Sequence, residues 1–133
     1  MVTLPLTGFY ASLLALLYIG LAINIIRLRW KHKVGIGDGD NRSLAKAIRV
    51  HGNFAEFVPL ALILLACYEL NAASVMMLHG LGAALVVARV FHVIGLTKSI
   101  GTSIQRQIGV LLTFLVILVL AIENIRLFVS ALR

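Results

Sequence analysis

Charged residues are scarce in this chain, and acidic residues are the scarcest. Aspartate and glutamate number 5 against 12 lysines and arginines, and charged residues are 13% of the 133 positions, whereas 61% are hydrophobic. An ordinary soluble domain carries about 25% charged residues. This composition excludes a soluble domain and indicates a single membrane domain, 1–133, whose outer surface is covered by lipid.

Cysteine is nearly absent, and so is any pattern of a cleaved leader. Cys67 is the sole cysteine, which excludes a disulfide within the chain. Its apolar surroundings predict a small side chain packed among helices, not a reactive thiol. The opening residues, MVTLPLTGFYASLL, include neither a basic segment nor a small-residue cleavage site. We therefore expect a first membrane helix that is retained, not a signal peptide.

Long apolar runs are what the chain has in their place. A helix that spans a membrane needs about 20 mostly apolar residues. Four segments meet this requirement, at about 6–29, 43–70, 74–96 and 104–130. Ser43 is the expected N-cap of the second segment. The sequence thus predicts an all-α integral membrane protein, a bundle of four transmembrane helices.

The segment VGIGDGDNRS between the first two helices matches no ligand-binding pattern. It has neither the GxGxxG spacing after a strand nor a Gly-Lys-Ser/Thr end. It also lacks the glycine and the closing glutamate of a calcium loop. We expect a flexible glycine-rich turn here and no metal site.

The basic side chains gather at the ends of the apolar segments. This placement argues against nucleic acid as a partner, because no soluble basic face results. Eight of them flank the first and third connections, namely Arg27, Arg29, Lys31, Lys33, Arg42 and Lys46, then Lys98 and Arg106. By the positive-inside rule, both connections are expected in the cytoplasm and both termini outside. Arg126 and Arg133 at the far end oppose this orientation but are outnumbered.

The stretch AIRVHGNFAEFVPLALILLA, residues 47–66, places polar residues at the start of a membrane helix. Arg49, Asn53 and Glu56 stand at i, i+4 and i+7 and so share one helix face. Gly52 lies on the same side and leaves space beside them. His51 points elsewhere, about 200° around the helix from Arg49, and is expected to support the helix.

The third helix carries Arg89 and His92, at i and i+3 on one face. An arginine inside a membrane helix costs about 2.5–3.5 kcal/mol and needs a partner. We expect Glu56 of the second helix to be that partner, since both residues approach the same end of their helices.

Weaker signals lie nearer the other end of the expected bundle. Gly80 and Gly82 predict a face that packs closely on another helix, because small residues let helix backbones approach in lipid. His79 is expected to be a packed histidine. Glu123 is expected to pair with Arg126 at i+3.

Two interpretations of the polar residues stay open at this point. In the first, Arg49, Glu56 and Arg89 form an ion-pair cluster that holds two helices in register. In the second, they line a pocket for a small anionic ligand, because the cations there, including Lys98 and Arg106, outnumber the single Glu56. Four helices shelter polar groups poorly, which favours an oligomer with the site between subunits.

The spacing Arg49-(x)3-Asn53-(x)2-Glu56-(x)2-Pro59, followed by ALVVARVFHVIG in the third helix, resembles the MAPEG family. These are membrane-associated proteins in eicosanoid and glutathione metabolism, including microsomal glutathione transferases and leukotriene and prostaglandin synthases. The resemblance covers nearly the whole chain and is closest to short bacterial members, which implies a bacterial inner-membrane location.

The resemblance implies a homotrimer with glutathione between neighbouring subunits near the cytoplasmic side. Arg49, Asn53 and Glu56 fall on the family's glutathione-contacting positions, and Arg89 on its third-helix arginine. Arginines suit the two carboxylates of glutathione, and Glu56 suits its ammonium. A neighbouring arginine also favours the thiolate form of the thiol.

The chain departs from the family pattern at the reacting end. His92 and Leu96 stand where the synthases have tyrosines, and the thiolate-activating arginine would fall near Ser103. Arg106, about one turn further along, is the catalytic candidate, and His92 is a candidate ligand-binding donor.

The resemblance implies a glutathione transferase or peroxidase that acts on lipophilic electrophiles supplied by the membrane lipids. The alternative is a non-catalytic binder of glutathione, another anionic thiol or a lipid head group. A small transporter is less favoured, because the four segments show no inverted repeat.

Overall fold

The computed structural model describes residues 3–71, 74–98 and 103–133, with the side chains of 96–98 left out. It contains four long helices, α1 (Pro5–His32), α2 (Arg42–Leu70), α3 (Val75–Lys98) and α4 (Ile104–Ala131). All four are long and apolar enough to cross a membrane. Their bounds lie within three residues of the expected segments, so the prediction of four membrane helices is confirmed.

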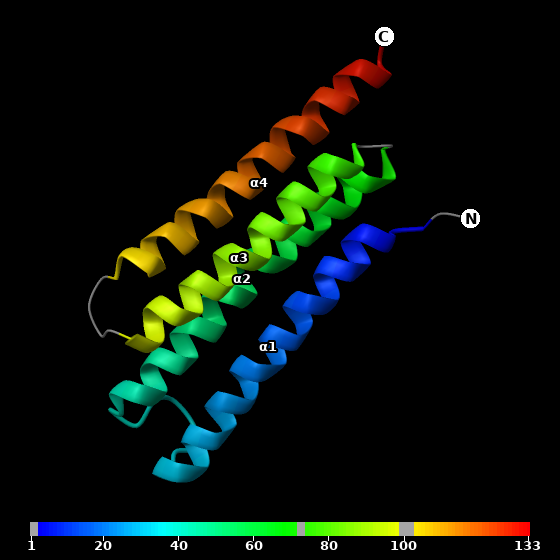
Figure 1. Cartoon of the computed structure of the whole chain (residues 1–133). Coiled ribbons are helices and arrows are strands. Elements are labelled where there is room, and N and C mark those ends of the chain that lie inside the picture. Colours follow the sequence, from blue (N-terminus) through cyan, green and yellow to red (C-terminus); the bar gives the residue numbers. More distant parts are fainter. Residues whose placement is uncertain (1–2, 72–73, 99–102) are drawn as a thin grey trace.

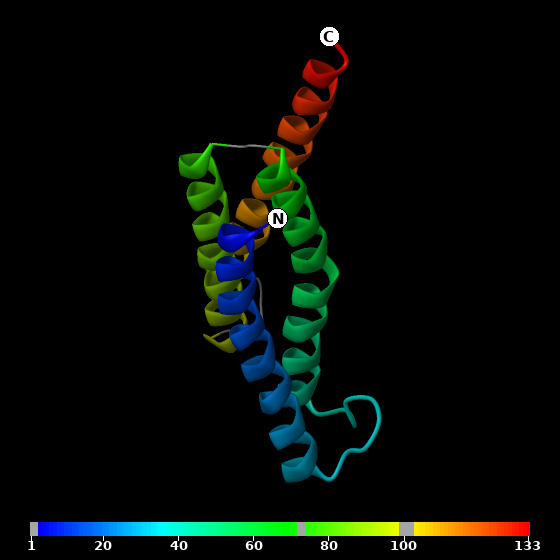
Figure 2. The same ribbon diagram turned by 90° about the vertical axis from the view of Figure 1, so that its right-hand side faces the viewer.

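In the bundle, α2 and α3 each pack on all three other helices, and α1 and α4 lie on opposite sides of this pair (Figures 1 and 2). α3 and α4 share the largest contact, and α1 packs on both α2 and α3. α4 also packs on α2, but α1 and α4 do not touch within the described residues. α1 and α4 are therefore held together only through α2 and α3.

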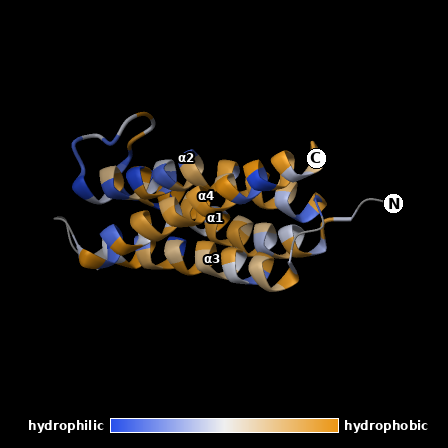
Figure 3. Cartoon of the chain, turned by 90° about the horizontal axis from the view of Figure 1, so that it is seen from above, coloured by the Kyte–Doolittle hydropathy of each residue, from blue (hydrophilic) through white to orange (hydrophobic). Residues whose placement is uncertain are grey.

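The bundle has two chemically different ends. At the connection end, α1 and α3 finish and α2 and α4 begin; at the opposite, termini end, α1 begins and α4 finishes (Figure 1). Figure 3 shows hydrophilic residues gathered toward the connection end and apolar residues along most of the helix length. A helix of 28 residues is about 42 Å long at 1.5 Å per residue, enough for the hydrocarbon core and both head-group layers.

Apolar side chains fill the space between the helices. Leu14 of α1, Leu65 of α2, Leu85 of α3 and Leu120 of α4 are each no more than 1% exposed. Large apolar side chains also cover the outside, which a lipid environment favours; they include Ile63, Leu115, Ile125 and Phe128.

The second helix begins differently from the prediction. Its N-cap is Asn41, whose side-chain oxygen accepts hydrogen bonds from the backbone N–H of Ser43 at 3.0 Å and of Leu44 at 3.1 Å. The expectation of a Ser43 cap was therefore wrong. Asn41 serves because its backbone is extended, which points its amide at the free N–H groups of the first turn.

The α1–α2 connection is folded around one arginine instead of being a simple flexible turn. Nη1 of Arg29 lies 3.4, 3.2 and 2.9 Å from the carbonyl oxygens of Val34, Gly35 and Gly37. Gly37 and Gly39 adopt the left-handed backbone that glycine favours, with φ of +70° and +57°. The Arg29 side chain thus stabilises the fold of the α1–α2 connection.

The small residues of α3 have separate environments. Gly82 is buried against the Tyr10 ring of α1, so close that a Cβ there would overlap it. Gly80 is exposed and has open space around it, so close packing is confirmed for Gly82 alone. The packing expected for Cys67 was wrong, because this side chain is exposed on α2.

Candidate functional site

The outer layer of the site is an ion pair on the surface of α2. Nη1 of Arg49 lies 3.2 Å from Oε1 of Glu56, and the two side chains are 61% and 49% exposed. Their i, i+7 spacing brings them together on one face, as the sequence predicts. Gly52 has open space where a Cβ would stand. A surface depression of about 370 Å³ is lined by Arg49, Gly52 and residues of the α1–α2 connection.

The inner layer is a buried pair between α2 and α3. Nη2 of Arg89 donates a hydrogen bond of 2.9 Å to Oδ1 of Asn53, and these residues are 0% and 8% exposed. The ion pair expected between Arg89 and Glu56 was wrong: among the described residues, Glu56 pairs with Arg49 instead. The reason is rotational, since Asn53 faces α3 whereas Glu56 faces outward. The expectation that Asn53 shares one exposed face with Arg49 and Glu56 was therefore also wrong.

Arg89 is incompletely satisfied in this position. Its Nη2 also points to Nδ1 of His92 at 3.4 Å, and its guanidinium lies 5.5 Å from the centre of the Phe54 ring. Nε and Nη1 are buried and have no hydrogen-bond partner in the part of the chain described. A buried donor without a partner costs about 1–3 kcal/mol, and more when charged.

Close approach of α3 and α4 fixes the position of Arg89 and His92. A Cβ at Gly109 would lie 2.6 Å from the carbonyl oxygen of Ala88 and 2.8 Å from the N of His92. Glycine is thus required where the helices meet. Ser103 adds a second link, because its hydroxyl donates to the carbonyl oxygen of Gly95 at 2.9 Å.

His92 is buried on α3 beside Arg89. Its ring is 1% exposed, and its Nδ1 lies 3.4 Å from Nη2 of Arg89. Arg106 is half-buried in the first turn of α4, where Oγ of Ser103 caps its backbone N–H at 3.3 Å. The side chains of Leu96 and Lys98 fall outside the described residues. The structure brings together Arg49 with Glu56 on the outside of α2, and Arg89 with Asn53 and His92 between α2 and α3. Arg106 lies where the start of α4 closely approaches Gly95 of α3.

The other polar residues of the sequence analysis have structural partners. The His51 ring lies 4.5 Å from the Tyr18 ring of α1, in keeping with a supporting role. His79 shares a 2.8 Å hydrogen bond with the hydroxyl of Tyr10. The expected pair of Glu123 and Arg126 is confirmed at 2.7 Å.

Sequence reasoning missed two polar residues that join helices. The Glu69 carboxylate of α2 accepts hydrogen bonds from the backbone N–H of Leu6 at 3.0 Å and of Thr7 at 2.7 Å, which caps α1. Nδ2 of Asn124 donates to the carbonyl oxygen of Leu64 at 3.0 Å, which joins α4 to α2. The presence of Glu69 and Asn124 within apolar segments was itself a signal, because a polar side chain within a membrane helix needs a partner.

Comparison with known proteins agrees with this architecture. The model of the MAPEG family matches residues 7–126. The inner membrane protein YecN of Escherichia coli K12 is 33% identical over 119 residues, covering 90% of this chain and 89% of that protein. YecN of Escherichia coli O6:H1 matches to the same extent. No solved structure matches the chain.

The family match includes residues of all four membrane helices, among them the outer pair, Arg49 and Glu56, and the inner pair, Arg89 and Asn53. The curated relative aligns over nearly its full length, so the likeness is not confined to one motif. This protein is therefore an integral membrane protein that belongs to the MAPEG family.

Proposed function

We propose that the protein binds glutathione as a homotrimer and uses it as a transferase or peroxidase toward lipophilic electrophiles. The supporting observation is that Arg49 is more than half exposed beside Glu56, while the buried Arg89 keeps two donors without a partner among the described residues. This surplus of positive charge suits a ligand with two carboxylates and a thiolate. Membership of a family that includes glutathione transferases supports the same ligand.

The exposure of the outer layer supports a site completed by a second copy of the chain. Arg49 and Glu56 lie on the side of α2 that no other helix of the chain covers. Packing of a neighbouring subunit there would enclose a ligand and reduce the screening of its charges by water. The buried hydrogen bond between Asn53 and Arg89 would then fix the position of α2 against α3.

We further propose an inner-membrane location, by analogy with YecN. The connection end would face the cytoplasm and the termini end the outside, because the first connection and its flanks carry six of the 12 lysines and arginines. Glutathione would enter from the cytoplasm, and the electrophile would partition from the lipid.

Arg106 is the proposed stabiliser of the thiolate. A positive charge beside a thiol favours its deprotonated, nucleophilic form. The proton leaves to solvent, and the thiolate sulfur then forms a bond to the electrophilic carbon of the second substrate. The bond from that carbon to its leaving group breaks at the same time, and the leaving group departs with the electron pair into solvent. Ser103 helps to place Arg106, because it fixes the start of α4 against α3.

A second candidate function is binding without turnover. His92 and Leu96 replace the tyrosines of the family's synthases, and His92 is 1% exposed, which limits its contact with a ligand. In this alternative, the same residues hold glutathione, another anionic thiol or a lipid head group. Saturable binding without turnover over a broad panel of electrophiles would favour it.

Calorimetry of glutathione binding to the detergent-purified protein tests the proposal. Arg49→Ala and Glu56→Gln should each weaken binding about tenfold or more, because each removes a charged partner of the ligand. Glu123→Gln is the matched control, since it breaks another glutamate–arginine pair at the opposite end. Binding should be retained in this control.

The same preparation decides between the open interpretations. A folded, trimeric wild type that binds no glutathione would overturn the proposal and leave Arg49, Glu56 and Arg89 as structural residues. Equal loss of binding in the Glu123→Gln control would show a general effect of charge or stability, which would also contradict the assigned site.

A further inference from the structure

The end of α1 and the α1–α2 connection carry the two most exposed large apolar side chains among the described residues. Trp30 is 81% exposed and Ile36 is 94% exposed. The connection projects from the bundle beside the start of α2 and includes an apolar stretch (Figures 2 and 3). We propose that this segment is a membrane anchor, which places Trp30 and Ile36 in the head-group layer beside the bundle and prefers anionic lipid.

The fold of the connection holds Ile36 away from the bundle. The Arg29 guanidinium binds backbone carbonyl oxygens both before and after this residue. Nδ2 of Asn41 lies 3.1 Å from Nδ1 of His32, and this contact joins the start of α2 to the end of α1. Ile36 therefore turns inward only if these contacts are lost, and its side chain is best covered by something outside the bundle.

Trp30 stands at the level of the lipid head groups. α1 has 28 residues, which is about 42 Å at 1.5 Å per residue, whereas the hydrocarbon core is about 30 Å thick. A centred helix thus extends about 6 Å, or about four residues, beyond the core at each end. Trp30 is two residues before the end of α1 and lies in this part. Tryptophan is enriched at this level, because its ring is apolar and its N–H is polar.

The charge of the same segment suits anionic lipid. Residues 29–42 carry four basic and two acidic side chains, a net charge of +2 with histidine neutral. Lys31, Lys33 and Arg42 are exposed, and none of them has an ion pair within the described part of the chain. Apolar insertion and basic charge together hold a segment on a membrane surface better than either one alone. A soluble anion would leave the apolar side chains in water, which favours a lipid surface as the partner.

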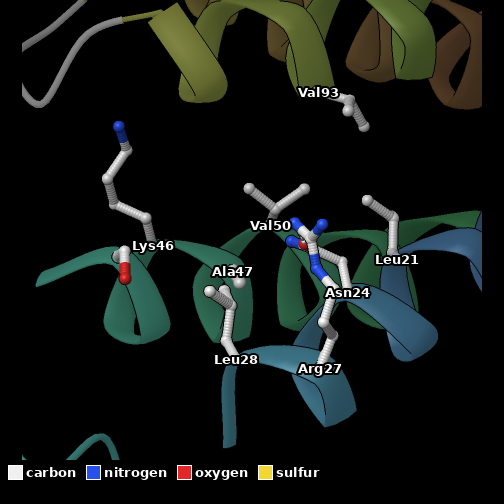
Figure 4. A pocket seen from close by; sticks show the side chains of 9 residues that line it. Leu21, Asn24, Arg27, Leu28, Lys46, Ala47, Val50 and Val93 are labelled. Atoms are coloured by element: carbon white, nitrogen blue, oxygen red, sulfur yellow. Dashed lines mark hydrogen bonds between the residues drawn. The ribbon is translucent and has the colours of Figure 1, made fainter. Parts of the chain in front are cut away.

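The anchor lies apart from two recesses at the same end. The pocket among α1, α2 and α3 contains Arg27 and Lys46 (Figure 4), and a depression lies beside Arg49. Neither Trp30 nor Ile36 lines either recess. The anchor is therefore independent of glutathione binding, and the two proposals can fail separately.

Tryptophan fluorescence of the full-length protein in lipid vesicles tests the proposal, because Trp30 is the single tryptophan. The vesicles contain phosphatidylcholine, with or without phosphatidylglycerol, and carry bromine either near the head group or near the end of the acyl chains. Iodide on both sides of the vesicle is the quencher in water. We expect Trp30 to be quenched most by bromine near the head group and little by iodide.

A double variant moves the tryptophan from α1 to the connection. Trp30→Phe with Ile36→Trp should show the same preference for bromine near the head group, because the connection lies in the same layer. The wild-type protein is the reference for this variant, and circular dichroism checks that both are folded. The preference should be stronger in vesicles that contain phosphatidylglycerol, since the segment is basic.

Two further charge changes, made in the moved-tryptophan variant, separate the anchor from the general charge of the protein. Lys31→Gln with Lys33→Gln should abolish the effect of phosphatidylglycerol, because it removes two exposed cations of the segment. Arg126→Gln with Arg133→Gln is the matched control, since it removes the same charge at the termini end. The effect of phosphatidylglycerol should be retained in this control.

Four outcomes would overturn the proposal. Quenching of the moved tryptophan by iodide but not by brominated lipid would place the connection in water. Protection from both quenchers would instead place a second copy of the chain over it. Stronger quenching by bromine at the end of the acyl chains would place it in the hydrocarbon core. Equal loss of the phosphatidylglycerol effect in the two charge variants would show a general attraction to the membrane.

Discussion

At the termini end of the bundle, acidic side chains are bound to partners within the chain. Glu69 binds two backbone amides of α1, and Glu123 binds Arg126. At the connection end, cations outnumber acids, and the buried Arg89 keeps two donors without partners in the described structure. At the termini end, the polar groups thus hold helices together. At the connection end, there are more positive charges and hydrogen-bond donors than partners for them among the described residues.

This difference separates structural from functional polarity. A polar group in lipid is stabilising only when its partner is present, as for Glu69 and the α1 amides. A surplus of unpaired positive charge destabilises the folded chain, and it is best explained by an anionic ligand. The five predictions below vary groups at the two ends, and they run from the largest expected effect to the smallest.

The largest effect is expected at Arg106, where the proposed function places the thiolate. Arg106→Ala should lower the rate of glutathione transfer about 100-fold or more, because it removes a preorganised positive charge beside the reacting atom. Glutathione binding measured by calorimetry should stay nearly unchanged. A variant that keeps its full rate would remove Arg106 from the reaction.

Asn53 tests the buried layer of the same end. Asn53→Ala should lower the free energy of unfolding by about 1.5–3 kcal/mol, because Arg89 loses its closest hydrogen-bond acceptor. Asn53→Asp, which keeps an acceptor of similar size, should be tolerated better. Titration with a denaturing detergent, followed by circular dichroism, measures both. Equal stability of the alanine variant and the wild type would show that the Arg89–Asn53 hydrogen bond does not stabilise the bundle.

Gly109 and Gly80 contrast close and open helix faces. Gly109→Ala should lower the free energy of unfolding by about 1–3 kcal/mol, because the new Cβ meets the backbone of α3. Gly80→Ala, where space is open, should be neutral or stabilising by about 0.5–1 kcal/mol. The same detergent titration compares them. A tolerated Gly109→Ala would mean that α4 can move away from α3 at little cost.

Glu69 tests the structural end. Glu69→Ala should lower the free energy of unfolding by about 1 kcal/mol, because the first turn of α1 loses the acceptor of two N–H groups. Glutathione binding should be retained. Glu69→Gln, which keeps one carbonyl oxygen, should be intermediate in the same titration. A loss of ligand binding without a loss of stability would break the contrast between the ends.

The smallest effect is expected at Arg126, in the exposed pair with Glu123. Arg126→Ala should leave the melting temperature unchanged within the scatter of the measurement, because exposed ion pairs contribute little to stability. Arg49→Ala is compared with it, since both arginines are more than half exposed. A clear drop in the melting temperature of Arg126→Ala would give the termini pair a larger role than its exposure indicates.

Sequence periodicity predicted much of this structure. Apolar run lengths gave the four helices to within three residues, and the i, i+7 spacing brought Arg49 to Glu56. The partner of Arg89 could not be obtained in this way, because it depends on how α2 is rotated against α3. Glu69 was missed for a related reason: its partners are backbone amides of another helix, which no residue type reveals.

The pairing of Arg89 with Asn53 also bears on how the chain is made. Synthesis proceeds from the N-terminus, so α2 enters the bilayer before α3 leaves the ribosome. The acceptor on Asn53 is therefore in place when the guanidinium of Arg89 arrives. α1 is stable in lipid before the other helices are made, because its middle is almost wholly apolar. Because of the order of the helices along the chain, Arg89 never enters the lipid without its hydrogen-bond acceptor on α2.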